Sequence, residues 1–342
     1  MTLQALESST KAEARIYNVG VFGATGYTGQ LLLNLLREHP YTQLAFATSE
    51  REKALEDGTP LIPSAEAPLE QVDAVFLCLP NGVSGGVAAQ AVERGVRVID
   101  LSADLRLDDP AVYEKWYRMP NPAPHLLPAP FGLPELYRDH IRGAQYVANP
   151  GCHVTAALLA LIPLAKHGML SGTPIMVDSK TGVSGAGKEL KLESMFCEVY
   201  GDAKPYNIGR KHRHVPEIEQ TLHKLQPDAG TLVFSPTLIP IEVGILSTVF
   251  ATLKPNISLE QVQAAFEAQY ASEPLVKLLP LGKVARIRDV AHTNGAEVAV
   301  SEGAGETIII TCAIDNLRKG ASAQALQNFN VMFGLSETLG LL

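Results

Sequence analysis

One cysteine in the sequence stands in a setting that favours reactivity. Cys152 directly follows Asn-Pro-Gly and leads into the helix-forming run TAALLALIPLA. Unpaired N–H groups and the helix dipole stabilise an anion in the first turn of a helix, so we expect a lowered pKa for the Cys152 thiol. The predicted chemistry is nucleophilic attack with a covalent intermediate on sulfur. A cysteine that merely packs after a turn is the competing interpretation.

The other three cysteines lack this setting. Cys78 and Cys312 lie in strand-like runs and are interpreted as core residues, and Cys197 is interpreted as structural. No CxxC spacing occurs among the four, which argues against a disulfide framework or a zinc knuckle. The pattern is typical of a protein from a reducing cytoplasm.

A basic segment with two histidines, GRKHRHVPEIEQ, precedes a helix that we expect to open at Pro216. Its cations suit an acyl phosphate or a carboxylate, which makes Arg213 a candidate for substrate binding. His214, next to the helix start, is predicted to transfer a proton. His212 could take that role, bind phosphate or be held by Glu217. A solvated basic loop is the alternative, and a metal site lacks a third ligand at a recognisable spacing.

A glycine-rich stretch, GATGYTG, follows the strand-like VGVF and opens a leucine-rich helix. Glycines here permit a tight turn and let a pyrophosphate approach the N–H groups of the helix start. A βα turn without a ligand is the alternative. The residues predicted to bind a cofactor in this loop are Gly23, Ala24, Thr25, Gly26, Tyr27, Thr28 and Gly29.

The end of the next strand-like run distinguishes two nicotinamide cofactors. An acidic residue here would bind the ribose 2′-hydroxyl of NAD, whereas arginine beside small hydroxyls suits the 2′-phosphate of NADP. Thr48, Ser49 and Arg51 therefore predict NADP(H). Glu50, between them, favours NAD.

A second glycine-rich motif, GVSGAGKE at 182–189, has the frame of a nucleotide triphosphate loop. The residue after Lys188 should be Ser or Thr to bind magnesium, and it is Glu189, which weakens an ATPase or kinase interpretation. Ser184 and Gly185 could instead close over the nicotinamide, and Lys188 could hold a substrate phosphate. A turn without a ligand is the remaining alternative.

A nicotinamide-binding loop combined with a nucleophilic cysteine narrows the reaction. Hydride transfer to a thioester on sulfur converts an activated acid into an aldehyde, whereas dehydrogenation of a simple alcohol needs no sulfur. We therefore predict oxidoreduction at the aldehyde level. The rival hypotheses are an NADP-binding sensor without catalysis and a nucleotide triphosphatase that uses residues 182–189.

The elements that must position these residues indicate two domains. Strand-like and helical runs alternate from Ile16 to Val98, which predicts an α/β protein with a doubly wound parallel sheet. We expect a Rossmann-type domain over residues 1–150, completed by a helix in 320–342. Residues 151–319 are expected to form an α+β catalytic and oligomerisation domain. The segment 104–145, rich in Pro, Tyr and Arg, is interpreted as a long irregular connection.

Length and charge agree with a two-domain enzyme of a small substrate. A chain of 342 residues is too long for one ordinary core. Its net charge of -8 disfavours nucleic acids and anionic membranes as partners. Residues 1–15 carry no apolar core and are expected to be neither a signal peptide nor an anchor, and no run is typical of a membrane span. A cytoplasmic protein without a bound metal is predicted.

Together, the motifs resemble those of the N-acetyl-gamma-glutamyl-phosphate reductases, a family within the aspartate-semialdehyde dehydrogenase superfamily. One departure is that His153-Val154 follow NPGC, where the family usually has Tyr-Pro, so that an extra imidazole neighbours the nucleophile. The matching stretches span nearly the whole chain and are VFGATGYTG, DLSADLRL, FGLPELYR, NPGC, SKTGVSGAGK, KHRHVPEIEQ and AIDNLRKG.

The resemblance implies NADPH-dependent reduction of acetylglutamyl phosphate to its semialdehyde, with release of phosphate, in arginine biosynthesis. It implies that Cys152 is the nucleophile, that His214 is the acid/base, and that the enzyme is a cytoplasmic homotetramer or dimer. A relative that reduces a carrier-linked aminoadipyl phosphate in lysine biosynthesis is the alternative, and the motifs PGC and SGAGK favour the arginine enzyme. The further residues with implied substrate or cofactor roles are Arg106, His212, Glu217, Ser184 and Asn316.

Overall fold

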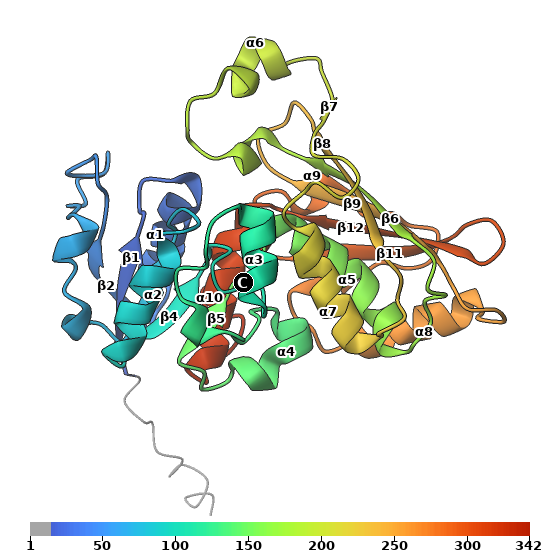
Figure 1. Cartoon of the computed structure of the whole chain (residues 1–342), viewed down its shortest axis with the longest axis horizontal. Coiled ribbons are helices and arrows are strands. Elements are labelled where there is room, and N and C mark those ends of the chain that lie inside the picture. The colour runs from blue at the N-terminus through green and yellow to red at the C-terminus, as the bar shows by residue number, and fades with distance from the viewer. Residues whose placement is uncertain (1–14) are drawn as a thin grey trace, which may run out of the picture.

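The computed structural model describes residues 15–342. The expectation for the N-terminal stretch falls almost entirely on residues 1–14, outside this range. Two β-sheets organise the chain (Figure 1). The first is parallel throughout, with strand order β2-β1-β3-β4-β5. Its strands are β1 (Tyr17–Phe22), β2 (Thr42–Ala47), β3 (Ala74–Leu77), β4 (Arg97–Asp100) and β5 (Tyr146–Ala148).

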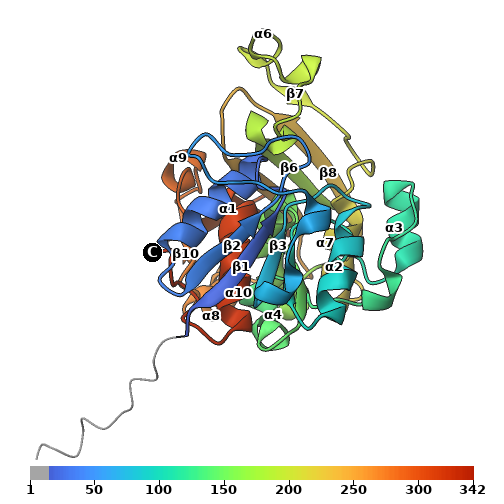
Figure 2. The ribbon, with the colours of Figure 1, turned by 90° about the vertical axis from the view of Figure 1, so that its left-hand side faces the viewer.

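Helices cover both faces of the first sheet, as Figure 2 shows for α1 (Tyr27–Glu38) and α2 (Ser84–Glu93) on its two sides. Val19 and Val21 of β1 belong to the apolar cluster that also holds the inner face of α1. The same cluster takes in α10 (Ala323–Met332), whose Phe329 is fully buried. On the other face of the sheet, Phe22 of β1 shares an apolar cluster with Ala88 of α2. The predicted doubly wound, Rossmann-type sheet is confirmed.

Contrary to our expectation, the segment 104–145 is not irregular throughout, because it contains two helices. These are α3 (Pro110–Tyr117) and α4 (Pro134–Ile141), and each begins at a proline. Proline suits the first position of a helix, where its missing N–H has no intrahelical partner to lose. The Asp109 side chain also accepts the Ala111 N–H at 2.8 Å and caps α3. Pro110 and Pro134 therefore mark helix starts.

The second sheet is mixed, with strand order β10-β11-β12-β9-β6-β8-β7. Its strands are β6 (Ile175–Thr181), β7 (Lys204–Pro205), β8 (Leu232–Leu238), β9 (Ile245–Thr252), β10 (Val276–Leu278), β11 (Ala296–Glu302) and β12 (Thr307–Ile314). The accompanying helices are α5 (Cys152–Lys166), α6 (Phe196–Val199), α7 (Val215–Leu225), α8 (Leu259–Tyr270) and α9 (Ile287–Val290). Single 3-10 turns are η2 (Ser64–Glu66), η3 (Leu69–Gln71), η4 (Pro124–Leu126), η5 (Val183–Ala186) and η6 (Leu192–Ser194).

Helix α5 forms the centre of the larger core. Its residues from His153 to Ala165 are all buried, and it shares an apolar cluster with α7, α8 and strands of the second sheet. A helix that is apolar all round needs neighbours on every side, and this one has them. Over residues 15–342, no helix combines the length and the apolarity needed to cross a membrane.

The first sheet ends at Ala148 and α5 begins at Cys152, while α10 returns to the first sheet. The division that we expected at residue 150, with 320–342 returning to the first domain, stays a prediction.

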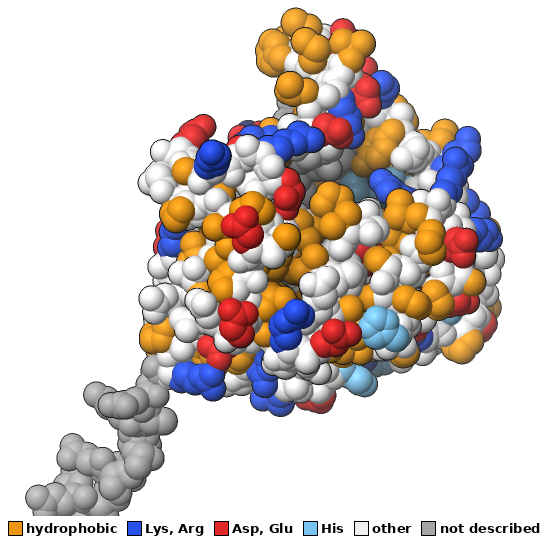
Figure 3. Space-filling view, turned by 60° about the vertical axis from the view of Figure 1, so that its left-hand side comes forward, with side chains coloured by type: hydrophobic (Ala, Val, Ile, Leu, Met, Phe, Trp, Pro, Cys, Tyr) orange, Lys and Arg blue, Asp and Glu red, His pale blue; other side chains and the backbone are white. Residues whose placement is uncertain are grey.

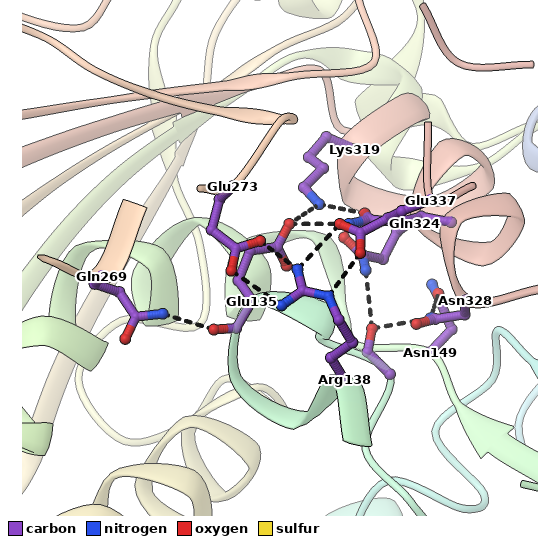
Figure 4. A network of polar contacts seen from close by, with 11 residues as sticks. Glu135, Arg138, Asn149, Gln269, Glu273, Lys319, Gln324, Asn328 and Glu337 are labelled. Carbon is purple, nitrogen blue, oxygen red and sulfur yellow. Dashed lines mark hydrogen bonds and ion pairs between the residues drawn. The ribbon is translucent and has the colours of Figure 1, made fainter. Parts of the chain in front are cut away.

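A buried polar network joins α4 to the π-helical turn at Arg318–Ser322 and to α10 (Figure 4). Lys319 donates to a carboxylate oxygen of Glu135 at 2.6 Å and to the side-chain oxygen of Gln327 at 2.5 Å. The side chains of Lys319 and Glu135 are both 0% exposed. Nearby, Arg138 pairs with Glu273 and with Glu337. Buried charges of this kind require their partners, so the network fixes how these elements meet.

Residues 190–208, which we call the arm, project from the body of the molecule around α6 (Figure 1). Figure 3 shows hydrophobic side chains gathered at its end. The large hydrophobic residues exposed on the arm are Leu190, Leu192, Met195, Phe196, Tyr200 and Ile208.

Candidate active site

Cys152 is the first residue of α5 and stands where two cavities meet. Gly151, in extended backbone conformation, precedes it as the N-cap. One cavity has a volume of about 590 Å³ and the other about 360 Å³. The side chains and backbone that line both are Arg106, Cys152, Gly185 and His214. A reacting group on the Cys152 sulfur is therefore accessible from both sides.

His214 lies against the backbone just before the nucleophile. It immediately precedes α7, and its N–H donates to His212 Nδ1 at 3.2 Å. A Cβ at Gly151 would overlap His214 Nε2 and come within 2.8 Å of the Cδ2 and Cε1 atoms of that ring. Only glycine therefore lets the imidazole approach this closely. The structure brings Cys152 and His214 together, as the sequence predicted.

Glu217, in the first turn of α7, joins the two helix starts. Its Oε1 accepts the Gly151 N–H at 3.0 Å, and its Oε2 lies 3.6 Å from a guanidinium nitrogen of Arg106. Arg106 is held by the carbonyl oxygens of Asn149 at 2.7 Å and Leu101 at 2.6 Å. Glu217 lines neither cavity, so its position is that of a support for Arg106 and Gly151.

The expected lowering of the Cys152 thiol pKa is wrong. Burial raises the pKa of Cys152 to about 11, and it outweighs the backbone N–H groups of the helix start and the charge of Arg106, which lower it. Burial also moves the histidine pKa values, to about 4 for His212, to about 3 for His153 and well below the ordinary value for His214. At neutral pH the site therefore holds a neutral thiol beside neutral imidazoles.

The larger cavity is bordered by the basic segment with two histidines and by the arm. His212 and Arg213, the two residues of this segment for which substrate binding is predicted, line this cavity, and the Arg213 guanidinium lies 5.3 Å from the centre of the Tyr117 ring. Lys188 lies elsewhere. It lines the smaller cavity, and its Nζ is 3.3 Å from the Thr25 carbonyl oxygen, next to the glycine loop.

The smaller cavity is formed by the glycine loop and the second glycine motif. The start of α1 has no side-chain cap, which leaves N–H groups of its first turn for a ligand. A Cβ at Gly29 would overlap the Gly23 carbonyl oxygen and lie 2.9 Å from the Ala24 Cα, so glycine is required for this tight turn. The predicted cofactor residues lining this cavity are Gly26, Tyr27, Thr28, Gly29, Ser184, Gly185 and Asn316. The donor set fits a pyrophosphate.

The residues predicted to select the cofactor lie outside both cavities. Thr48 is fully buried, and its hydroxyl accepts the Gly23 N–H at 3.2 Å, so it supports the glycine loop from beneath. The Ser49 hydroxyl accepts the N–H groups of Arg51 and Glu52. The Glu50 carboxylate accepts the Ser64 N–H at 3.0 Å, which occupies one of its oxygens.

The second glycine motif does not have the geometry of a nucleotide triphosphate loop. Strand β6 leads into the single 3-10 turn η5, followed by Gly187 at a φ of +82°. A triphosphate loop needs a helix at this point, and none follows here. Ser184 accepts instead from the Asn316 side chain at 3.0 Å, and Asn316 accepts the Gly244 N–H at 2.7 Å. The motif is therefore held beside the smaller cavity.

Three residues contribute to the site although sequence reasoning assigned them no role. Gly320 packs on the nucleophile, because a Cβ there would lie 2.8 Å from the Cys152 Cβ. Tyr206 of the arm lines the larger cavity. Asn149 links the site to the polar network of Figure 4, since its side-chain oxygen accepts from Asn328 at 2.9 Å. Asn149 is the first residue of the NPGC motif, and that motif is the signal that could have indicated it.

The remaining cysteines and possible metal ligands add no chemistry to the site. All four cysteines are free, with Cys312 buried in β12 and Cys197 exposed on α6. Cys78 lines the smaller cavity, but burial raises its pKa to about 12. Among residues 15–342 no group of three His, Cys, Asp or Glu side chains is placed to hold a metal ion.

Two family descriptions match the chain and define its class. Residues 18–144 match the semialdehyde dehydrogenase NAD binding domain, and residues 152–316 match the semialdehyde dehydrogenase dimerisation domain. The chain is thus an oxidoreductase of the semialdehyde dehydrogenase class, with a domain for a nicotinamide cofactor. N-acetyl-gamma-glutamyl-phosphate reductases from Pelobacter propionicus and Geobacter metallireducens are 42% and 41% identical over 95% of this chain and 97% of their own. The chain belongs to the N-acetyl-gamma-glutamyl-phosphate reductase family.

Solved structures share the fold. Aspartate semialdehyde dehydrogenase II from Vibrio cholerae superposes with a TM-score of 0.72 at 23% identity, over 93% of this chain and 98% of that one. The aspartate semialdehyde dehydrogenase from Candida albicans, solved with NADP, has a TM-score of 0.66 at 15% identity over 93% of this chain and 100% of its own.

Proposed function

We propose that the chain reduces N-acetyl-gamma-glutamyl phosphate to N-acetylglutamate semialdehyde with NADPH and releases phosphate, as a step of arginine biosynthesis. The observation that carries the proposal is the position of Cys152 where the two cavities meet. One cavity has cationic and histidine side chains for an acyl phosphate, and the other has a glycine loop for a pyrophosphate. A group bound to sulfur would be within reach of both. The names of the relatives point to the same reaction.

The first chemical step forms a carbon–sulfur bond. As the Cys152 sulfur attacks the acyl carbon, His214 accepts the thiol proton and the carbon–oxygen bond to phosphate breaks. The products are a thioester on Cys152, inorganic phosphate and an imidazolium at His214. The thiol pKa is raised and the His214 pKa is lowered, so both groups are neutral before the reaction. The thiol proton passes to His214 during attack and is then available for the later steps.

The second step reduces the thioester, and NADPH supplies the hydride to its carbonyl carbon when bound. His214 gives its proton to the oxygen, which yields a thiohemiacetal on Cys152. Removal of that proton breaks the carbon–sulfur bond, the aldehyde leaves, and the proton returns to sulfur through His214. We assign substrate binding to Arg106, His212 and Arg213, with Glu217 holding Arg106 in place.

NADP(H) is the proposed cofactor. The glycine loop at 23–29 would bind its pyrophosphate, and Ser184, Gly185 and Asn316 would lie on the opposite side of the cavity. Ser49 and Arg51 are proposed to bind the 2′-phosphate. The engagement of Glu50 with the Ser64 N–H supports this choice, because that carboxylate is the group that would favour NAD.

The experiment that tests the function is turnover of both acyl phosphates by the Cys152→Ser variant. We expect the wild-type chain to reduce acetylglutamyl phosphate and not carrier-linked aminoadipyl phosphate. Cys152→Ser should lose nearly all turnover and keep its NADPH affinity, whereas Cys197→Ser, changed at an exposed thiol, should match wild type. Full activity of Cys152→Ser would remove sulfur from the mechanism.

We further propose the domain division of the sequence prediction, with residues 1–150 and 320–342 binding NADP(H) and residues 151–319 responsible for catalysis and oligomerisation. A cytoplasmic homotetramer or dimer is proposed with it. The matching description of residues 152–316 as a dimerisation domain supports this arrangement. Analytical ultracentrifugation at micromolar concentration distinguishes the two oligomers from a monomer.

A further inference from the structure

His153, the residue after the nucleophile, contacts the arm. Its Nε2 lies 3.1 Å from the Tyr206 hydroxyl, and its Nδ1 lies 2.8 Å from the Ser179 hydroxyl. The Ser179 hydroxyl in turn lies 2.8 Å from that of Ser247. His153 is 3% exposed, and both serines are 0% exposed. Both ring nitrogens of His153 therefore have partners, one in the second sheet and one on the arm.

The arm has few other ties to the body. Strand β7 pairs with β8 over only two residues, and the Tyr206 N–H donates to the Pro236 carbonyl oxygen at 3.0 Å. Within residues 15–342, every other hydrogen bond made by an arm side chain joins it to the arm itself. The contact between His153 and Tyr206 is thus the arm's side-chain hydrogen bond to the helix that carries Cys152.

The same part of the arm forms a wall of the larger cavity. Lys204, Tyr206 and Asn207 line this cavity together with Cys152 and His212. The His153 ring also packs edge-on against that of His212, with centroids 5.5 Å apart. A displacement at Tyr206 would therefore change the wall of the cavity that Cys152 also lines.

We propose that His153 is a positioning residue that tethers the arm to the nucleophile's helix through Tyr206 and so fixes the wall of the substrate cavity relative to Cys152. The inference rests on the proposed function of that cavity. It gives the imidazole next to the nucleophile a role distinct from proton transfer. Loss of the tether should weaken substrate binding more than it slows the chemical steps.

The test combines kinetics with hydrogen–deuterium exchange on three variants of the full chain. His153→Phe keeps a ring and removes both nitrogens, Tyr206→Phe removes only the hydroxyl, and Tyr200→Phe is the matched control on the exposed part of the arm. The first two should raise KM for the acyl phosphate about two- to tenfold, the usual effect of one hydrogen bond, with kcat within about twofold. In His153→Phe and Tyr206→Phe, the KM for NADPH should match that of wild type. In Tyr200→Phe, both KM values and kcat should match wild type.

Amides of residues 200–208 should exchange faster in His153→Phe and Tyr206→Phe than in wild type or Tyr200→Phe. The double variant should raise KM no further than His153→Phe alone, because that variant already lacks the contact that Tyr206→Phe removes. Additive KM effects, or unchanged exchange in both single variants, would overturn the tether. If the wild-type chain reduces no acyl phosphate, the proposed function fails, while the exchange result still decides the tether.

Discussion

At the scale of single residues, the pair formed by Cys152 and His214 differs from a preformed thiolate with a protonated histidine. Burial favours the neutral form of each group, so proton transfer between them must accompany attack on the substrate. Hydrogen bonding and charge at the start of α5 then lower the cost of forming the anion. His214, rather than the helix start, becomes the residue on which activation of the sulfur depends.

The two candidate imidazoles can be separated by substitution. His214→Ala should lower kcat by about 10²–10⁴, the usual contribution of a general acid/base. His212→Ala should cost less in kcat and more in KM, because the His212 ring lines the larger cavity while its Nδ1 accepts the His214 N–H. Steady-state kinetics of the two variants measure the difference. A larger kcat loss in His212→Ala would exchange the two roles.

Gly151 offers a test of the distance between the imidazole and the nucleophile. In Gly151→Ala the new Cβ would overlap the His214 ring, which must then move away. We expect kcat to fall by at least about tenfold, in line with the sensitivity of catalysis to displacements of this size. NADPH affinity should be unchanged. Gly86→Ala is the control, since a Cβ there meets nothing within 4 Å, and equal kcat values in the two variants would disprove the close approach.

At the scale of elements, the glycine loop depends on backbone atoms more than on side chains. In Gly29→Ala the added Cβ would meet the backbone of Gly23 and Ala24, which cannot move without opening the turn between β1 and α1. We expect the Kd for NADPH to rise at least about tenfold, measured by quenching of intrinsic fluorescence. The change in free energy of unfolding should be determined in parallel. Unchanged NADPH affinity would place the cofactor elsewhere.

Several elements could be predicted from the sequence because local signals agreed with the tertiary structure. The βα alternation gave the first sheet, the run after Cys152 gave α5, and Pro216 marked the start of α7, which begins at Val215. The segment 104–145 was interpreted as an irregular connection, although Pro110 and Pro134 mark helix starts in it. The thiol pKa was mispredicted because burial depends on the whole fold. Tyr206 and Gly320 reach the site only through tertiary contacts, which no local pattern encodes.

At the scale of the whole molecule, three neutral histidines of the active site make stability depend on pH. Their folded pKa values lie below the ordinary value of 6.5, so the unfolded chain binds more protons below pH 6.5 and acid favours unfolding. The loss begins near pH 6.5 and levels off near pH 4 for His212 and near pH 3 for His153. His153 and His212 should each lower the free energy of unfolding by about 2 kcal/mol between pH 7 and pH 5, and His214 acts in the same direction.

Denaturant titrations at pH 7 and pH 5 on wild type and His153→Phe measure this effect. The variant should lose less stability on acidification than wild type, by about 2 kcal/mol. The raised pKa of Glu217 makes acid stabilise the fold, and it does so in both proteins. The difference between the two proteins therefore reports the effect of His153 alone. The same pH dependence in both proteins would contradict burial of a neutral imidazole at position 153.

The return of α10 to the first sheet has a consequence for biosynthesis of the chain. The fully buried Phe329 and Leu326 pack with Val19 and Val21, yet the ribosome makes α10 only after all strands of the second sheet. While the second sheet is being translated, the finished β1–β5 sheet must leave uncovered the part of one apolar face that α10 later occupies beside α1. Nascent chains stalled before residue 323 should therefore expose that face to chaperones, and release of α10 should end the exposure.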